Sequence, residues 1–262
     1  MRDRLISLVF WIWITLATVL FTVLVGVAAL LSAPFDRIRR LPRALTAWWG
    51  RAVLRANPIW TLTIDGQEHL PRRGAYVLAA NHASLADIIV LFHLRSPFKW
   101  IAKDSLYRVP FLGWSMHWAG NIHLVRGDQG SIRESYTEAL ACLKRGVPVM
   151  VFPEGTRTRS GELGPFKRGA FQLAIKAQVP VVPVVVHGTY ALIKPHSWVF
   201  RPAPGMRAQV LPPVPPPPQD SPGAADRLRD HVRGLVAGEL SRGQREPARQ
   251  GCTMHPGQTT GS

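Results

Sequence analysis

Cysteine and acidic residues are both scarce in this sequence of 262 residues. Cys142 and Cys252 are its only cysteines, which argues against a disulfide framework or a cysteine-rich metal site and favours a reducing compartment. Asp and Glu number 16 against 32 Lys and Arg, so the net charge is +16. An excess of this size concerns a protein's partners rather than its fold: it suits nucleic acid, an anionic membrane surface or phosphorylated substrates.

Charged residues are missing altogether from Ile6 to Ser32. As a helix, these roughly 27 residues would extend about 40 Å, which is longer than the ~30 Å hydrocarbon core of a bilayer. The run also exceeds the apolar region of a signal peptide, which is about 7–15 residues long. We therefore predict an uncleaved membrane anchor, with cleavage near Ser32-Ala33 as the alternative.

Arginines are concentrated on the C-terminal side of this run. By the positive-inside rule they place the rest of the protein in the cytoplasm, at the inner face of the cell membrane. Residues 33–57 interleave these arginines with apolar and tryptophan side chains, which predicts a second helix at the membrane interface. The sequence fits both a spanning helix and a two-helix hairpin that enters one leaflet. The arginines are Arg37, Arg39, Arg40, Arg43, Arg51 and Arg55.

Short runs of β-forming residues alternate with helical patterns from about Trp60 onward. This alternation predicts a three-layer α/β domain with a mostly parallel or mixed sheet. Helices are expected at Leu85–Leu94, Ser131–Arg145 and Gly169–Ala177, the second with a capping box made by Ser131 and Glu134. Strands are expected at Trp60–Ile64, Tyr76–Ala80, Lys99–Ala102, Ile122–Val125, Val147–Phe152, Val179–Val186 and Arg207–Leu211.

Four segments follow from these patterns. Residues 1–57 would form the membrane anchor and interfacial helix, and residues 58–211 the α/β domain. Residues 212–240 would contain an extended proline-rich linker, Pro212–Pro218, and a short amphipathic helix, Asp226–Leu240. Residues 241–262 are polar and predicted to be disordered.

The first group of residues that could carry chemistry is Asn81–Asp87, at the end of an expected strand. Ligands bind at strand C-termini in open α/β sheets. If His82 lies on the loop and Asp87 in the first helical turn, the carboxylate can hold one imidazole nitrogen and leave the other free to take a proton. The alternative is an ordinary loop histidine before a helix. Ser84 fits a helix cap better than a nucleophile.

A second group, Phe152–Arg157, follows another apolar strand. Gly155 permits a tight turn, Thr156 offers a hydroxyl, and Arg157 offers a planar fork that suits phosphate. The alternative is a strand exit with solvated cations. Two further blocks are weaker: Gly120–Arg126, which ends in arginine, and the apolar, proline-containing strand Val179–Val186.

Taken in this order, the four blocks resemble the glycerolipid acyltransferase family, over about residues 60–190. The family's histidine and aspartate, separated by four residues, are matched by His82 and Asp87, and its Phe-Pro-Glu-Gly-Thr-Arg block is matched letter for letter by Phe152–Arg157. The block ending in Arg126 is degenerate, because many members have Ile-Asp-Arg where this chain has Leu-Val-Arg.

The resemblance implies an activity and a mechanism. The enzyme would transfer a fatty acyl group from an acyl thioester to the free hydroxyl of 1-acyl-sn-glycerol-3-phosphate, giving phosphatidic acid. His82, oriented by Asp87, would act as general base, and backbone N–H groups at the start of the following helix would stabilise the oxyanion. Glu154, Gly155, Thr156 and Arg157, with Arg126, would hold the acceptor.

No metal or tightly held cofactor is implied, and the co-substrate would be acyl-CoA or an acylated carrier protein. The expected partners are therefore the membrane bilayer, a lysophospholipid and the acyl donor, with no nucleic acid. The arginines that follow the uncharged run would face anionic lipid. Attraction to such lipid contributes about 1 kcal/mol of binding free energy for each cation near the surface.

Three alternatives stay open. An enzyme of the same family could act on lyso-ornithine lipid, another lysophospholipid or glycerol-3-phosphate. A membrane-anchored serine hydrolase using Ser84 would be a different class, but the sequence has no Gly-x-Ser-x-Gly elbow. A nucleic-acid binder is suggested by charge alone, without a recognisable binding motif.

Overall fold

The computed structural model describes residues 2–57, 60–158, 160–192, 197–201 and 205–245. All seven expected strands are present and form one sheet in the order β1-β7-β6-β2-β5-β3-β4. Their bounds differ from the expected ones by one or two residues at most ends. The strands are β1 Leu62–Asp65, β2 Val77–Ala80, β3 Lys99–Lys103, β4 Ile122–Leu124, β5 Val149–Val151, β6 Val181–His187 and β7 Met206–Val210.

The sheet is mostly parallel, as the alternating pattern predicted. Strands β2, β3, β4, β5 and β6 run in one direction. β7 is antiparallel to β6, and β1 is parallel to β7. The three central strands β6, β2 and β5 therefore end at the same edge of the sheet, where their following loops meet.

Pro183 occupies a central strand although it has no N–H to donate. β7 pairs with β6 only at Val184–His187, and an isolated antiparallel bridge joins Val181 to Val214. Pro183 lies between these two pairings, so β6 tolerates it there. The bridge also shows that the proline-rich segment 212–218 is pinned to the sheet by Val214.

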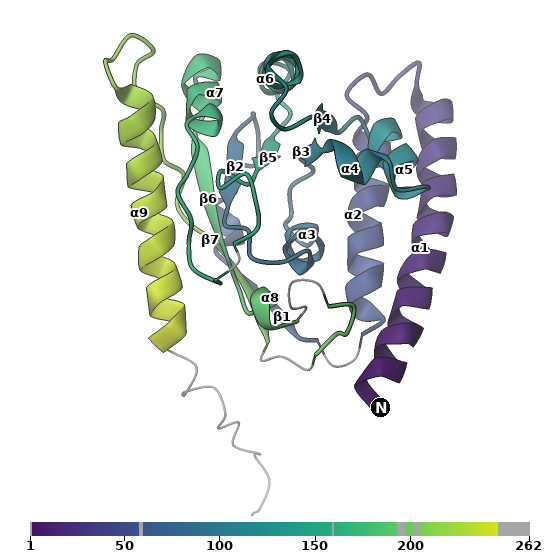
Figure 1. Cartoon of the computed structure of the whole chain (residues 1–262). Coiled ribbons are helices and arrows are strands. Elements are labelled where there is room, and N and C mark those ends of the chain that lie inside the picture. Colours follow the sequence, from purple (N-terminus) through teal and green to yellow (C-terminus); the bar gives the residue numbers. More distant parts are fainter. Residues whose placement is uncertain (1, 58–59, 159, 193–196, 202–204, 246–262) are drawn as a thin grey trace, which may run out of the picture.

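Helices cover both faces of the sheet (Figure 1), which completes the predicted three-layer arrangement. α6, α7 and α9 cover one face, and α2 and α3 the other. The helices and single turns are α1 Arg2–Ser32, α2 Arg40–Arg55, η1 Gln67–His69, α3 Ala86–Leu91, α4 Asp104–Tyr107, α5 Leu112–Trp118, α6 Gln129–Lys144, α7 Gly169–Ala177, α8 Thr189–Leu192 and α9 Ala224–Arg245.

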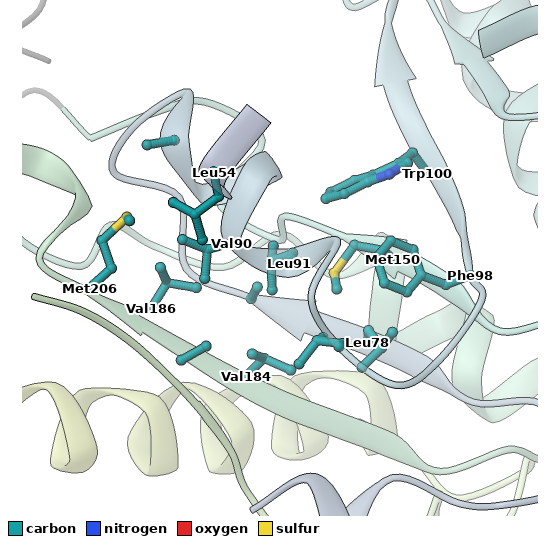
Figure 2. Close-up of a cluster of buried hydrophobic side chains, with 14 of the residues drawn as sticks. Leu54, Leu78, Val90, Leu91, Phe98, Trp100, Met150, Val184, Val186 and Met206 are labelled. Atoms are coloured by element: carbon teal, nitrogen blue, oxygen red, sulfur yellow. The ribbon is translucent and has the colours of Figure 1, made fainter. Parts of the chain in front are cut away.

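Alternate residues of the central strands supply two hydrophobic cores. Leu78 and Ala80 of β2 enter the cluster beneath α2 and α3, whereas Val77 and Ala79 enter the cluster beneath α6, α7 and α9. This is the period of two expected for a strand buried on both faces. Figure 2 shows the first cluster, in which Val184 and Val186 of β6 lie close to Val90 and Leu91 of α3.

Several helix ends differ from the sequence-based prediction, since α3 ends at Leu91 rather than Leu94 and α9 begins at Ala224 rather than Asp226. α6 starts at Gln129 rather than Ser131, because Asp128 is its N-cap and accepts from the Ser131 N–H at 2.9 Å. The Ser131 hydroxyl instead accepts from the Val125 N–H, so the predicted capping box with Glu134 is wrong. α9 extends to Arg245, so residues 241–245 are helical rather than part of a disordered tail. Residues 246–262 lie outside the described residues.

α1 is the one helix of the described chain that is long and apolar enough to cross a membrane. A core helix of a soluble protein would be mostly buried, but only 22% of the most apolar stretch of α1 is buried. This exposure fits a helix in contact with lipid. Its exposed large apolar residues include Leu5, Leu8, Val9, Ile12, Trp13, Leu16, Leu20, Val23, Leu24, Val27, Leu30 and Leu31.

The opposite side of α1 packs along the globular domain. Near its start, Ser7 Oγ accepts from the Phe200 N–H at 2.9 Å. Further along, Thr22 Oγ1 donates to the Phe111 carbonyl at 3.1 Å. α2 runs back alongside α1 (Figure 1) and packs between it and α3. The anchor and the domain therefore share a continuous interface.

Candidate active site

The two chemistry-bearing motifs meet at the carboxyl edge of the sheet. β2 and β5 are parallel neighbours, so the loops that follow them leave the sheet side by side. His82 comes two residues after β2 and Glu154 three residues after β5. The sequence expectation that both motifs lie at strand ends is confirmed, and the parallel pairing of the strands brings them together.

His82 and Asp87 form a buried hydrogen-bonded pair. His82 Nδ1 and Asp87 Oδ2 are 2.8 Å apart, with His82 on the loop and Asp87 in the first turn of α3. Asp87 is fully buried and His82 is 9% exposed. Because Nδ1 bonds to the carboxylate, Nε2 is the ring nitrogen that can take a proton from a substrate.

Asp87 also fixes the backbone that carries His82. Its Oδ2 atom accepts from the N–H groups of Ala83 at 2.7 Å and of Ser84 at 2.9 Å. A short acidic side chain at a helix start commonly accepts such bonds. These two N–H groups are therefore occupied and are not available to an oxyanion.

The imidazole plane is set by Phe152, the first residue after β5. The two rings are stacked, with centroids 3.9 Å apart and planes inclined by 11°. Trp100 lies on Phe152 in turn, at a centroid distance of 5.6 Å. The aromatic column limits rotation of His82 and excludes water from one face of its ring.

The His82 loop is fixed by the loop after β5 on one side and by strand β6 on the other. The His82 N–H donates to Glu154 Oε1 at 2.7 Å, and the His82 carbonyl accepts from the Thr158 N–H at 2.9 Å. On the other side, the Asn81 amide donates to the Val186 carbonyl and accepts from the Val186 N–H, at 3.0 and 2.8 Å.

Glu154 therefore has a different environment from the one the sequence suggested. It is buried, and its second oxygen, Oε2, accepts from the Gly164 N–H at 2.9 Å. Both carboxylate oxygens bind backbone N–H groups, whereas we expected this side chain to contact the acceptor. Its geometry is that of a positioning residue for the His82 loop.

The following residues of the motif turn outward. Gly155 has a φ of 74°, in the region that favours glycine, and its α-carbon faces the Lys167 side chain: an added Cβ would lie 2.9 Å from Lys167 Nζ. Thr156 and Arg157 are exposed. Lys167 thus joins the cationic group around the turn.

Arg126 lies farther from His82 than the residues of the Phe152–Arg157 motif do. It follows β4, at the edge of the sheet and three strands away from β2 in the order β2-β5-β3-β4, which corresponds to about 14 Å at roughly 4.8 Å per strand. Partial burial lowers the pKa of its guanidinium. The structure therefore brings His82, Asp87 and Glu154 into direct contact and places Arg126 on the rim.

Ser84 is buried, and its hydroxyl accepts from the Ala86 N–H at 3.3 Å. Among the hydrogen bonds of the described residues, His82 pairs with Asp87 and not with Ser84. This arrangement gives the serine hydrolase alternative no support. Within the same residues, no group of three or more His, Cys, Asp or Glu side chains is placed to hold a metal ion.

Three contributors to the site were not predicted from the sequence. Asn81 and Phe152 are the first residues of the two motifs, but the sequence does not show that they contact β6 and the His82 ring. Lys167 was visible only as one of several downstream cations. Each acts through a partner on another strand or loop, so its role depends on the sheet order.

Residues 61–187 match the family model described as Acyltransferase. The 1-acyl-sn-glycerol-3-phosphate acyltransferase of Chlamydomonas reinhardtii is 36% identical over 236 residues, covering 89% of this chain and 69% of its own length. The human enzyme of that name, form alpha, is 37% identical over 185 residues, covering 68% and 64%.

Coverage of the relatives is uneven. The chain spans 45% of the chloroplastic enzyme of Brassica napus, to which it is 38% identical over 157 residues. The crystal structure of the 1-acyl-sn-glycerophosphate (LPA) acyltransferase PlsC from Thermotoga maritima superposes with a TM-score of 0.78 at 28% identity, covering 93% of this chain and 96% of that one.

Proposed function

The chain belongs to the acyltransferase family, and from this premise we propose that it transfers a fatty acyl group from an acyl thioester to the free hydroxyl of 1-acyl-sn-glycerol-3-phosphate, giving phosphatidic acid. The observation that carries the proposal is the buried His82–Asp87 pair, 2.8 Å apart, beside the Gly155–Arg157 turn. The relatives named for this reaction support the choice of acceptor.

The reaction needs one general base. His82 Nε2 takes the proton of the acceptor hydroxyl while the oxygen attacks the thioester carbonyl carbon. The carbon–sulfur bond then breaks, and the proton passes from the imidazolium to the leaving thiolate. Asp87 stabilises the imidazolium that forms in between. No acyl-enzyme is required, because a thiolate is a good leaving group.

The acceptor's phosphate would be held on the outward side of the turn. Arg157 offers a bidentate fork, Thr156 a hydroxyl, and Lys167 a further cation, with Gly155 allowing a close approach of backbone. Arg126, on the rim, would contact the acceptor through its long side chain. Glu154 supports this arrangement indirectly, by fixing His82 relative to the turn.

The acyl donor would be acyl-CoA or an acylated carrier protein, used as a co-substrate rather than a resident cofactor. Both carry negative charge, and the net charge of +16 favours their encounter with this protein. The histidine and the turn contact the transferred carbonyl and the acceptor in either case.

The membrane is the source of the acceptor. The domain packs along α1 from Ser7 to Thr22, so only the outward face of the helix would meet lipid. This one-sided exposure supports a helix pair seated in one leaflet better than a free-standing span. The arginines that follow α1 favour the cytoplasmic face of the cell membrane.

The test is an acyl-transfer assay on membranes containing the protein, with labelled acyl-CoA and acyl carrier protein offered against a panel of lysolipids. Transfer to 1-acyl-sn-glycerol-3-phosphate is expected. His82→Ala should lower the rate by about 10²- to 10⁴-fold, the usual contribution of a general base, while the protein stays folded and membrane-bound.

The outcomes separate the alternatives. Selective transfer to another lysolipid or to glycerol-3-phosphate would keep the mechanism and change the acceptor. Release of free fatty acid without transfer would favour a hydrolase. Substantial transfer by the His82→Ala protein would contradict the general-base assignment.

A further inference from the structure

A polar cavity opens at the amino edge of the sheet, opposite the edge that carries His82. It has a volume of about 730 Å³. Its walls include Tyr76, immediately before β2, and Gly146–Pro148, before β5. His82 follows the other end of β2, six residues from Tyr76, which is about 20 Å at roughly 3.3 Å per residue.

Arginine dominates the charge of this cavity. Glu68 is the one carboxylate among its lining residues, and within the described part of the chain none of the arginines forms an ion pair. Asp36, a further carboxylate close to Arg40 and Arg43, accepts from the Leu41 N–H at 2.8 Å. The lining arginines are Arg40, Arg43, Arg72, Arg73 and Arg95.

Arg43 is held in place by backbone carbonyls and forms no ion pair among the described residues. It is 4% exposed, and its Nε and Nη1 atoms donate to the backbone carbonyls of Arg39 at 3.1 Å and Pro97 at 3.2 Å. Burial lowers the pKa of Arg43, the Asp36 charge opposes this, and the neighbouring Arg40 charge adds to it. Burial of this cation is costly, the Asp36 charge offsets part of the cost, and an anion in the cavity would offset more of it.

The cavity also offers a neutral donor. The Tyr76 hydroxyl donates to Ser96 Oγ at 2.5 Å, and both residues line the wall. Because Ser96 Oγ accepts this bond, its own hydrogen can be donated to a ligand. Arginine forks and a hydroxyl donor are the groups that recognise phosphate.

We propose that this cavity binds a phosphate group, at a site separate from the one that holds the acceptor during catalysis. Two sources of phosphate are available. Phe35 and Leu41, 89% and 50% exposed, flank the α1–α2 turn beside Ile38 and Arg40 of the wall, so an anionic phospholipid headgroup can reach it. Under the proposed function, the nucleotide end of coenzyme A is the other source.

Hydrogen exchange of the full chain in phosphatidylcholine nanodiscs tests this site locally. The probes are coenzyme A, inorganic pyrophosphate and phosphatidylglycerol added to the nanodisc. At least one probe should slow exchange in residues 66–76 and 94–98. Removal of two guanidinium groups in Arg72→Gln/Arg73→Gln should raise the probe concentration for half-maximal protection about tenfold or more.

The matched control is Arg133→Gln/Arg242→Gln, which removes the same charge from α6 and α9. The control should behave like the parent. Protection by phosphatidylglycerol alone identifies a headgroup site, and protection by coenzyme A identifies a donor site. Absence of protection with every probe, or equal losses in both double variants, would overturn the proposal. Acyl transfer is measured separately, so a failed cavity test leaves the proposed function intact, and the converse also holds.

Discussion

Hydrogen bonds and ring stacking fix the position of His82 and leave its Nε2 atom free to accept a proton. Asp87 holds Nδ1, Phe152 stacks on the ring, and the N–H and carbonyl of His82 are both bonded to the loop after β5. Placement errors of about 1 Å can cost on the order of 10²-fold in rate. Groups that do not touch the substrate are therefore expected to matter for the rate.

Glu154 provides the sharpest test at this scale. Glu154→Gln keeps the shape but replaces one acceptor oxygen by an NH2 group, so either the His82 or the Gly164 N–H loses its partner. We expect kcat to fall about tenfold or more, with a smaller change in the acceptor KM, and a loss of about 1–3 kcal/mol in stability. Steady-state kinetics and thermal unfolding measure these effects.

The comparison variant for this prediction is Arg157→Ala, which should mainly raise the acceptor KM if the turn binds phosphate. A Glu154→Gln enzyme that showed a pure KM effect would return Glu154 to the acceptor-binding role expected from the sequence.

At the scale of secondary-structure elements, α2 is the bridge between the membrane helix and the domain. It packs against both α1 and α3. At Gly50 the approach to α3 is so close that an added Cβ would lie 2.7 Å from the Cβ of Phe92. A glycine in a helix interior disfavours the helix by about 1 kcal/mol relative to alanine, and here it permits the contact.

Gly50→Leu should disrupt this contact. The larger side chain would overlap Phe92 and lower stability by about 1–3 kcal/mol despite its better helix propensity. The expected result is a lower melting temperature in detergent. Phe92→Ala, which opens space at the same point, should make the double variant less destabilised than the sum of the single variants. Strict additivity of the two effects would show that the introduced leucine side chain does not overlap Phe92.

At the scale of the whole molecule, two half-buried histidines couple stability to pH. Burial lowers the pKa of His93, and the charges of Arg51 and Arg55 add to this while a bond to the Ile89 carbonyl opposes it. Burial likewise lowers the pKa of His187, with Arg207 adding and Glu239 opposing. Both groups are therefore harder to protonate in the folded chain than in the unfolded chain.

The sign of the effect follows from proton binding. Above the ordinary histidine pKa of about 6.5 both states are neutral and stability is unaffected. As pH falls below that value, the unfolded chain binds protons that the folded chain does not, and stability decreases. The melting temperature should therefore drop between about pH 6.5 and the folded pKa values.

His93→Gln/His187→Gln should flatten this slope, and His231→Gln, on the exposed side of α9, should leave it unchanged. A slope that is the same in all three proteins would assign the acid sensitivity to the general repulsion of a chain with net charge +16.

The sequence by itself determined the strands, the alternation of helices and strands, the membrane-type helix and the two motifs at strand ends. These follow from local periodicity, from the length of an uncharged run and from turn chemistry. Local patterns also misplaced the start of α6, because Asp128 and Ser131 are both competent caps and only the path of the preceding loop selects one.

Tertiary structure decided the rest. The sheet order places β2 between β5 and β6, and only that order lets Glu154 and Asn81 fix the loop of His82 from opposite sides. It sets Arg126 three strands away from β2, and it gathers arginines from distant segments around the cavity at the amino edge. Such contacts join residues far apart in the chain, so their geometry depends on packing and hydrogen bonding across the whole sheet rather than on any local preference of the sequence.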